Sequence, residues 1–240
     1  MRSSKYILRG LIRGIAAASA VCLMAAGAHA AFIIEVDTDG ADDGVLTYSP
    51  NFSFGGDTTT ASQSAASTAP FMSGGDSIYG GDGSALPDTY VFSYDPSVDA
   101  DNQEIPIYTE LGEDGYSSTA SGLTGGGPGL YFVYATWPHS SNVSGGDTRF
   151  TTTTTGDSSV IDFDQTGGGI GTGHYWYKVG EVNWSSGPIT VTMEPTVQNS
   201  FVSMRAAGML FELERPIPEP SVIALLGLGT LFVAARRRRR

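Results

Sequence analysis

Hydrophobic and polar positions divide the 240-residue chain into two apolar ends and a long mixed middle. The middle, from Ala31 to about Glu214, shows no helical period. Short alternating or aromatic runs recur there, separated by clusters of Gly, Asp and Pro. Such runs predict β-strands, and the clusters between them predict turns. The predicted strands are Phe32–Val36, Thr89–Tyr94, Ile105–Leu111, Leu130–Trp137, Arg149–Thr155, Ser159–Phe163, Tyr175–Trp184, Ile189–Met193 and Phe201–Glu212.

Many short strands joined by turns predict an all-β fold, an antiparallel β-sandwich of jelly-roll-like form. One domain over residues 31–214 is long enough to bury a core without disulfides. The single cysteine, Cys22, lies outside that domain, so thiol chemistry is excluded from the body. The Thr- and Ser-rich stretch 58–67 predicts an exposed loop.

The N-terminal apolar run spans residues 14–27 and follows four basic residues, so residues 1–30 predict a secretory signal peptide. Ala28 and Ala30 form a small-x-small cleavage site, which makes Ala31 the expected new N-terminus. A retained membrane anchor is the alternative, but the run is shorter than the roughly 20 residues that a span needs. A second alternative, a lipoprotein role for Cys22, is weakened because no leucine stands three positions before it.

The C-terminal apolar run spans residues 222–235 and carries no charge. It predicts a short transmembrane helix, because at a rise of about 1.5 Å per residue it covers roughly 21 Å, and long arginine side chains extend its reach by snorkelling. Arginine clusters prefer the cytoplasmic side of a membrane and would stop the tail there. Together with the signal peptide, this places the middle of the chain outside the cell. The membrane-stop residues are Arg236, Arg237, Arg238, Arg239 and Arg240.

Pro218, Glu219 and Pro220 stand just before this span. In the order of triplet, apolar span and arginine cluster, residues 215–240 resemble the PEP-CTERM sorting signal of Gram-negative bacteria. The resemblance implies that exosortase, a membrane protease, recognises the triplet, and that the protein reaches the cell surface or extracellular matrix. The two prolines keep the segment extended, as a protease cleft requires. An ordinary stop-transfer helix behind a Pro-rich linker is the alternative.

Charge is partitioned along the chain. Only four of the 13 basic residues lie in the middle, whereas all 25 acidic residues lie between Glu35 and Glu219. A surface of this kind repels nucleic acid and anionic lipid. The charge pattern therefore argues against a nucleic-acid partner and against a polyanion-binding role.

The second half of the body carries a further pattern of aromatic and glycine positions. It resembles the golvesin/xanthan-lyase carbohydrate-binding-like domain, a β-sandwich module, which implies the same fold here. Val179 stands where that family has leucine, and Ala207 stands where it has an aspartate, which puts any role of that aspartate in doubt. The matching segments are Gly129–Val133, Trp137-Pro138, Asp164-Gln165 and Trp176–Gly180.

The residues do not favour catalysis. The body has two histidines, His139 and His174, and a single lysine, and it contains neither a G-x-S-x-G nor an H-E-x-x-H motif. The leading hypothesis is an exported, non-catalytic protein with a structural or glycan-binding role, with exopolysaccharide as the candidate glycan partner. Because a glycosidase needs only two placed carboxylates, a secreted polysaccharide-active enzyme is the alternative.

Two sets of residues are candidate binding sites. Trp137, Trp176 and Trp184 are candidates for a glycan-stacking platform, although aromatic residues on strands usually lie in the core. Asp37, Asp39 and Asp42 resemble part of a calcium loop, but Ala41 takes the place of the third ligand. A Ca²⁺ site and a solvated acidic turn are the two interpretations of that stretch, and no other cofactor is predicted.

Overall fold

The structure is a computed structural model that describes residues 31–55, 62–80, 89–99, 108–110, 116–118, 127–138, 147–165, 176–196 and 204–217. Every helix or strand within these ranges is a β-strand, and all strand pairs are antiparallel, which confirms the all-β prediction. No helix in this part of the chain is long and apolar enough to cross a membrane. The predicted signal peptide and the predicted transmembrane helix lie outside the described residues.

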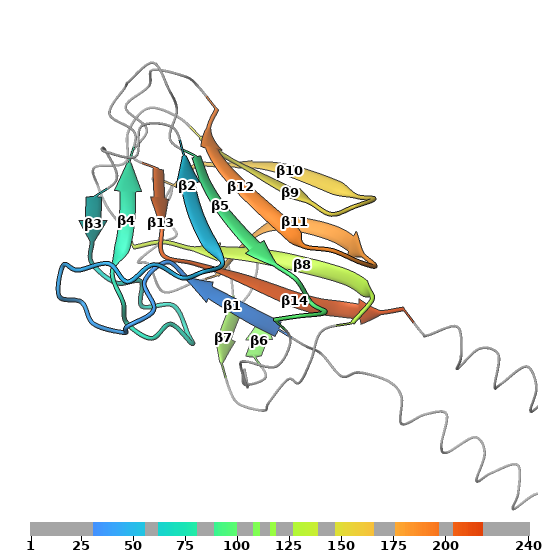
Figure 1. Cartoon of the computed structure of the whole chain (residues 1–240), viewed down its shortest axis with the longest axis horizontal. Coiled ribbons are helices and arrows are strands. Elements are labelled where there is room, and N and C mark those ends of the chain that lie inside the picture. Colours follow the sequence, from blue (N-terminus) through green and yellow to red (C-terminus); the bar gives the residue numbers. More distant parts are fainter. Residues whose placement is uncertain are drawn as a thin grey trace, which may run out of the picture.

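Two larger sheets and two smaller ones account for the described strands (Figure 1). The four-stranded sheet has the order β1 (Ala31–Glu35), β14 (Gly208–Pro216), β8 (Gly129–Thr136), β11 (Tyr177–Trp184). The five-stranded sheet has the order β10 (Ser158–Phe163), β9 (Thr148–Thr153), β12 (Ile189–Pro195), β5 (Thr89–Tyr94), β2 (Phe52–Gly55). The three-stranded sheet has the order β13 (Met204–Ala206), β4 (Ser77–Gly80), β3 (Ser62–Ser64), and β6 (Tyr108–Glu110) pairs with β7 (Tyr116–Ser118).

The main core lies between the four-stranded and five-stranded sheets. Strand alternation produces it: along β5 every second side chain is buried, and Thr89, Val91 and Ser93 point outward. Rings from the two sheets meet across the gap, as where Phe32 stacks on Tyr94 with ring centroids 4.6 Å apart. The two sheets therefore form a sandwich whose faces share one aromatic core.

The strand predictions differ from the structure in three places. The predicted strand Phe201–Glu212 breaks at Ala207 into β13 and β14, which belong to different sheets. Strands β2, β3, β4 and β7 were not predicted, because they are three or four residues long and three of them carry little beyond Ser, Gly and Tyr. The exposed-loop prediction for residues 58–67 is wrong for Ser62–Ser64, which pairs with β4. Residues 65–67 belong to no strand, as predicted, but Ser67 is buried.

The edge of β11 closes against the β9–β10 hairpin of the other sheet. A Cβ atom on Gly180 would lie 2.1 Å from Thr152 Oγ1, so only glycine permits this approach. The backbone N–H of Asn183, in β11, donates to Asp157 Oδ2 at 2.8 Å. Side chains of the hairpin thus satisfy part of an edge that would otherwise be open to pairing with another chain.

Both predicted membrane-directed ends leave the sandwich on the same side. Strand β1 runs antiparallel to β14, so Ala31 lies opposite Glu212, near the end of β14. The β1–β2 connection and the three-stranded sheet lie at the opposite end of the molecule (Figure 1).

Candidate functional site

The three tryptophans predicted as a glycan platform are buried in the structure. Trp137 stacks between Phe150 and Tyr177 in the main core. Trp176 belongs to a second hydrophobic cluster on the outer face of the four-stranded sheet, and its Nε1 donates to the carbonyl of Pro70 at 2.9 Å. Their ring faces are covered by protein, so the structure supports the core interpretation of these residues and offers no stacking platform on them. Trp184 is likewise buried, against Tyr131.

The three aspartates predicted as a calcium loop do not converge on one point. Asp37 is 0% exposed, and its two oxygens accept the backbone N–H groups of Thr47 at 2.7 Å and Asp76 at 3.0 Å. Asp39 accepts from Ala41 N–H instead. In the part of the chain that the structure describes, no three His, Cys, Asp or Glu side chains are grouped as a metal ion would require.

Asp76 and Asp42 form a carboxyl pair beside Asp37. Asp76 is 3% exposed, and its Oδ2 accepts the N–H of Gly44 at 2.8 Å. Burial raises the pKa of Asp76, and a hydrogen bond from its carboxyl group to that of Asp42 raises it further. The acidic loop cluster, defined here as Asp37, Asp42 and Asp76, therefore ties the β1–β2 connection to the segment before β4.

Gln165 was noted in the sequence only as part of a motif, and the structure gives it a physical role. Its side-chain amide is buried and pairs with the backbone of Arg205: Arg205 N–H donates to Oε1 at 2.9 Å, and Nε2 donates to the Arg205 carbonyl at 2.8 Å. The Thr148 hydroxyl donates a hydrogen bond to the same Oε1, with an oxygen–oxygen distance of 3.1 Å. The Gln165 amide thus makes the two hydrogen bonds to Arg205 that the backbone of a neighbouring strand would otherwise make.

Arg205 was not predicted as a site residue. Its side chain is only 6% exposed, and its described contacts are Ser64 Oγ, 3.3 Å from one terminal nitrogen, and the Tyr79 ring, whose centroid lies 5.3 Å from the guanidinium carbon. Its Nε has no hydrogen-bond partner. Burial lowers the pKa of the Arg205 guanidinium. Pairing across sequence-distant strands assembles this group, so no local pattern could have indicated it.

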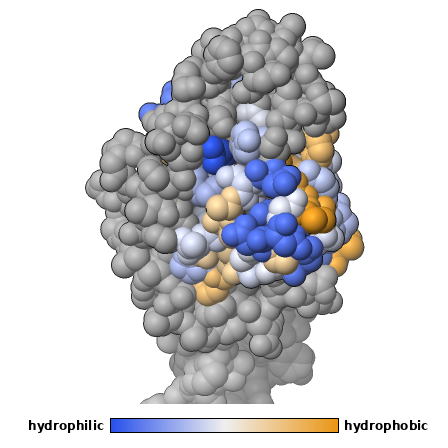
Figure 2. Space-filling view, turned by 90° about the vertical axis from the view of Figure 1, so that its left-hand side faces the viewer, coloured by the Kyte–Doolittle hydropathy of each residue, from blue (hydrophilic) through white to orange (hydrophobic). Residues whose placement is uncertain are grey.

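Figure 2 shows the end of the molecule at which the three-stranded sheet lies. Hydrophilic residues gather in the middle of this face, with hydrophobic residues at its side. Tyr79, on β4, is 37% exposed and lies directly opposite Arg205 in the sheet register. An aromatic ring that solvent reaches thus lies beside a nearly covered cation.

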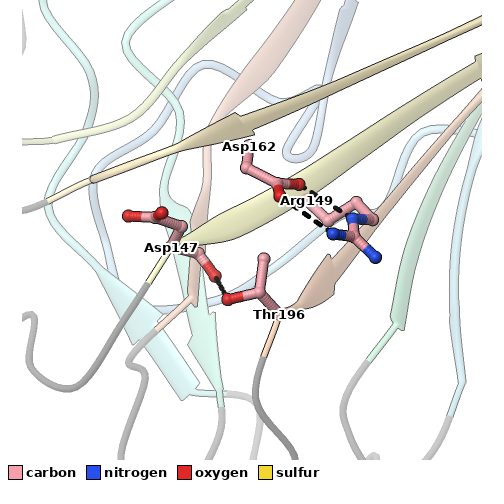
Figure 3. Close-up of polar contacts among 4 residues, drawn as sticks. All are labelled: Asp147, Arg149, Asp162 and Thr196. Atoms are coloured by element: carbon pink, nitrogen blue, oxygen red, sulfur yellow. Dashed lines mark hydrogen bonds and ion pairs between the residues drawn. The ribbon is translucent and has the colours of Figure 1, made fainter.

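A contrasting arginine lies on the outer face of the five-stranded sheet. Arg149 Nε and Nη2 donate to the two oxygens of Asp162 at 2.8 and 2.9 Å, while Asp147 uses its backbone carbonyl to accept from Thr196 Oγ1 (Figure 3). The Asp147 carboxylate points away from Arg149. Arg149 therefore has a bidentate carboxylate partner in open solvent, which Arg205 lacks among the described residues.

Comparison with known proteins gives one specific result. Residues 216–240 match the PEP-CTERM protein-sorting motif. This motif is a substrate signal for exosortase, a membrane protease, and it indicates export and membrane-associated sorting in Gram-negative bacteria. The predicted recognition residues Pro218, Glu219 and Pro220 fall inside the match and outside the described residues. No curated protein matches the chain.

Two kinds of solved structure share some similarity with the fold. A xanthan lyase from Paenibacillus has a TM-score of 0.44 at 14% identity, over 79% of this chain and 13% of that one. An exo-β-1,3-galactanase from Phanerochaete chrysosporium, solved with β-1,3-galactotriose, has a TM-score of 0.36 at 12% identity, over 76% of this chain and 29% of that one. This chain therefore spans less than a third of either protein, and these scores carry no argument about its function.

Proposed function

We propose that this chain is an exported protein of the cell surface or extracellular matrix, released or re-anchored by exosortase, whose β-sandwich serves a structural or glycan-binding role without catalysis. The observation that supports the non-catalytic part is the use made of the buried carboxylates. Both carboxylate oxygens of Asp37 accept hydrogen bonds from backbone N–H groups, and Asp76 accepts one from the backbone N–H of Gly44. These groups hold loops together and do not face each other across an open space.

The sorting half of the proposal is tested on the processed C-terminus. Mass spectrometry of the protein from its native host is expected to show a chain shortened near the triplet. The double variant Pro218→Ala/Pro220→Ala is expected to keep the full tail, and Pro216→Ala, just before the triplet, serves as the control. Unchanged processing of the double variant would show that the triplet is not the recognition element.

The binding half is tested with the processed protein isolated from the host. We expect it to co-sediment with the host exopolysaccharide and to release no reducing ends from it over prolonged incubation. Bovine serum albumin, another acidic protein, controls for non-specific trapping of protein in the sedimented exopolysaccharide. Sedimentation no greater than that of albumin would contradict the glycan-binding role.

A secreted polysaccharide-active enzyme is the second candidate, favoured by one observation. Asp42 and Asp76 form a carboxyl pair in which the pKa of Asp76 is raised, as in an acid catalyst. The pair is in hydrogen-bonding contact, however, whereas the two carboxyl groups of a glycosidase stand about 5 Å or more apart. Release of reducing ends that Asp76→Asn abolishes would favour this candidate over the non-catalytic one.

A further inference from the structure

The guanidinium of Arg205 is a buried charge without a carboxylate partner among the described residues. Its Nε donates to nothing, and one terminal nitrogen donates only to the neutral hydroxyl of Ser64. Proteins bury arginine almost always in an ion pair, because removing a charge from water is costly unless an opposite charge compensates it. Within the described ranges, nothing compensates the charge of Arg205, and an anionic ligand would supply that compensation.

The surrounding structure holds Arg205 in a fixed position. Met204 and Ala206 on either side are buried in the main core, so alternation directs the arginine side chain to the other face of the three-stranded sheet. The side-chain amide of Gln165 forms two hydrogen bonds with the backbone of Arg205. A binding group whose backbone is already fixed loses little further freedom when a ligand arrives.

The geometry beside the guanidinium limits which anion fits. The planar fork of arginine binds a carboxylate through two parallel hydrogen bonds. The Tyr79 ring adjoins it and is partly open to solvent, and an aromatic face suits the C–H face of a pyranose ring. The rest of the body is strongly acidic, which favours a ligand with one carboxylate on an otherwise neutral sugar over a dense polyanion.

We propose that Arg205, Tyr79 and Ser64 form a subsite for a sugar that carries a carboxylate, such as a uronic acid residue within a largely neutral polysaccharide. The proposal rests on the glycan-binding half of the proposed function and names the ligand class. Arg205 pairs with the carboxylate, and Tyr79 supports the ring. The three-stranded sheet, and with it the subsite, lies at the end of the molecule opposite Ala31 and the last residues of β14 (Figure 1).

Glucuronate and glucose are matched probes, because they differ only in the carboxylate. Titration of the processed, ¹⁵N-labelled protein is followed through the Nε–H signals of its arginines. We expect glucuronate to shift the Arg205 signal saturably, and glucose and acetate to bind at least about tenfold more weakly, since each lacks one of the two interactions. Ionic strength is held constant throughout with sodium chloride.

Arg205→Met and Arg149→Met are matched variants. The first is expected to weaken glucuronate binding about tenfold to a hundredfold, by loss of the charge-assisted pair. The second removes an exposed arginine that Asp162 already neutralises, and it is expected to leave binding unchanged. Without ligand, Arg205→Met is expected to melt no lower than the wild type, because it removes an uncompensated buried charge. Tyr79→Leu removes the aromatic ring and leaves the charge of Arg205 in place.

The outcomes separate this inference from the proposed function. Binding of host exopolysaccharide without any shift of the Arg205 signal by glucuronate overturns the subsite and leaves the glycan-binding role standing. Absence of all glycan binding overturns both. Acetate that binds as tightly as glucuronate overturns the sugar assignment. A large loss of melting temperature in ligand-free Arg205→Met, with no ligand effect on the wild type, shows that Arg205 is structural only.

Discussion

Carboxylates hold chain segments together in two regions of the sandwich, and they do so in opposite electrostatic settings. In the acidic loop cluster, Asp37 and Asp76 are almost fully buried, and burial raises the pKa of Asp76. At the β9–β10 hairpin, hydrogen bonds from Asn183 lower the pKa of Asp157, and the hydrogen-bonded Arg149 lowers that of Asp162. The pKa of an aspartate is therefore raised in one region, where burial dominates, and lowered in the other, where hydrogen bonds to the carboxylate dominate.

The two regions also differ in the groups that the carboxylates bind. In the acidic loop cluster, Asp37 forms an isolated antiparallel bridge with Tyr48, and its carboxylate adds acceptors for the backbone N–H groups of Thr47 and of the buried Asp76. At the hairpin, the Asp157 carboxylate accepts the backbone and side-chain N–H groups of Asn183 at the solvent-exposed edge of β11. The loop cluster should therefore be the more sensitive to substitution, and the predictions below test that ranking.

The largest effect is expected for Asp37→Ala. This change leaves the buried N–H of Asp76 and the part-buried N–H of Thr47 without acceptors. The first costs roughly 1–3 kcal/mol and the second about 0.5–1.5 kcal/mol, so the free energy of unfolding should fall by about 1.5–4.5 kcal/mol. Asp157→Ala, at the hairpin, should lower the free energy of unfolding by clearly less than Asp37→Ala, because solvent can replace the lost acceptor. Urea unfolding of both variants measures the difference. Equal losses would show that the two regions are equivalent and that burial is not the deciding factor.

A second prediction concerns the close approach of β11 to the hairpin. Gly180→Ala places a Cβ atom 2.1 Å from Thr152 Oγ1 and should cost about 1–3 kcal/mol through overpacking. Thr152→Ala in the same chain should recover part of that loss, because it removes the clashing hydroxyl and leaves only the Cβ contact at 2.9 Å.

Gly156→Ala is the control for this change, since a Cβ atom there meets nothing within 4 Å. Thermal unfolding of the four chains is sufficient to compare them. If Gly180→Ala has the same melting temperature as Gly156→Ala, the edge of β11 does not pack as closely against the hairpin as the structure indicates.

The smallest effects are expected in the pH dependence, where the two regions should have opposite signs. Folded Asp76 has a pKa above its ordinary value of 3.8, so its stabilising contribution is complete below that value and is lost as pH rises through the raised pKa. Asp157 and Asp162 have lowered pKa values, so their contribution is present above the ordinary value and is lost as pH falls through the lowered pKa.

Asp76→Asn and Asp157→Asn separate the two contributions. Urea unfolding between pH 3 and pH 7 should show that Asp76→Asn weakens the loss of stability on raising the pH, and that Asp157→Asn weakens the loss on lowering it. Parallel curves for both variants and the wild type would show that neither carboxyl group titrates differently in the folded and unfolded chains.

The predictions that succeeded from the sequence rest on local, linear patterns. Alternation along Thr89–Tyr94 and Ser159–Phe163 predicted β5 and β10 with little error, because one buried face imposes a period of two on the residues. The C-terminal sorting motif was recognised for the same reason, since its parts follow each other directly in the chain. Short strands such as β3 and β4 have no such period and were missed.

For the candidate binding residues too, the sequence supplied the residue type, whereas the environment of each residue came from distant parts of the chain. Residue type alone suggested Trp137, Trp176 and Asp37, but each of them is buried and satisfied by groups distant in the chain. Arg205 carried no sequence signal and Gln165 was noted only as part of a motif, because their environment is made by segments that pair across about 40 residues or more.

The sequence by itself determined the all-β class, the acidic body and the sorting motif, because period, composition and motif order are properties of neighbouring residues. Only the tertiary structure decided which carboxylates are buried, which tryptophans are covered and that one arginine has no described counter-charge. Burial and pairing are properties of the packed chain, in which residues that are far apart in sequence exclude water from one another.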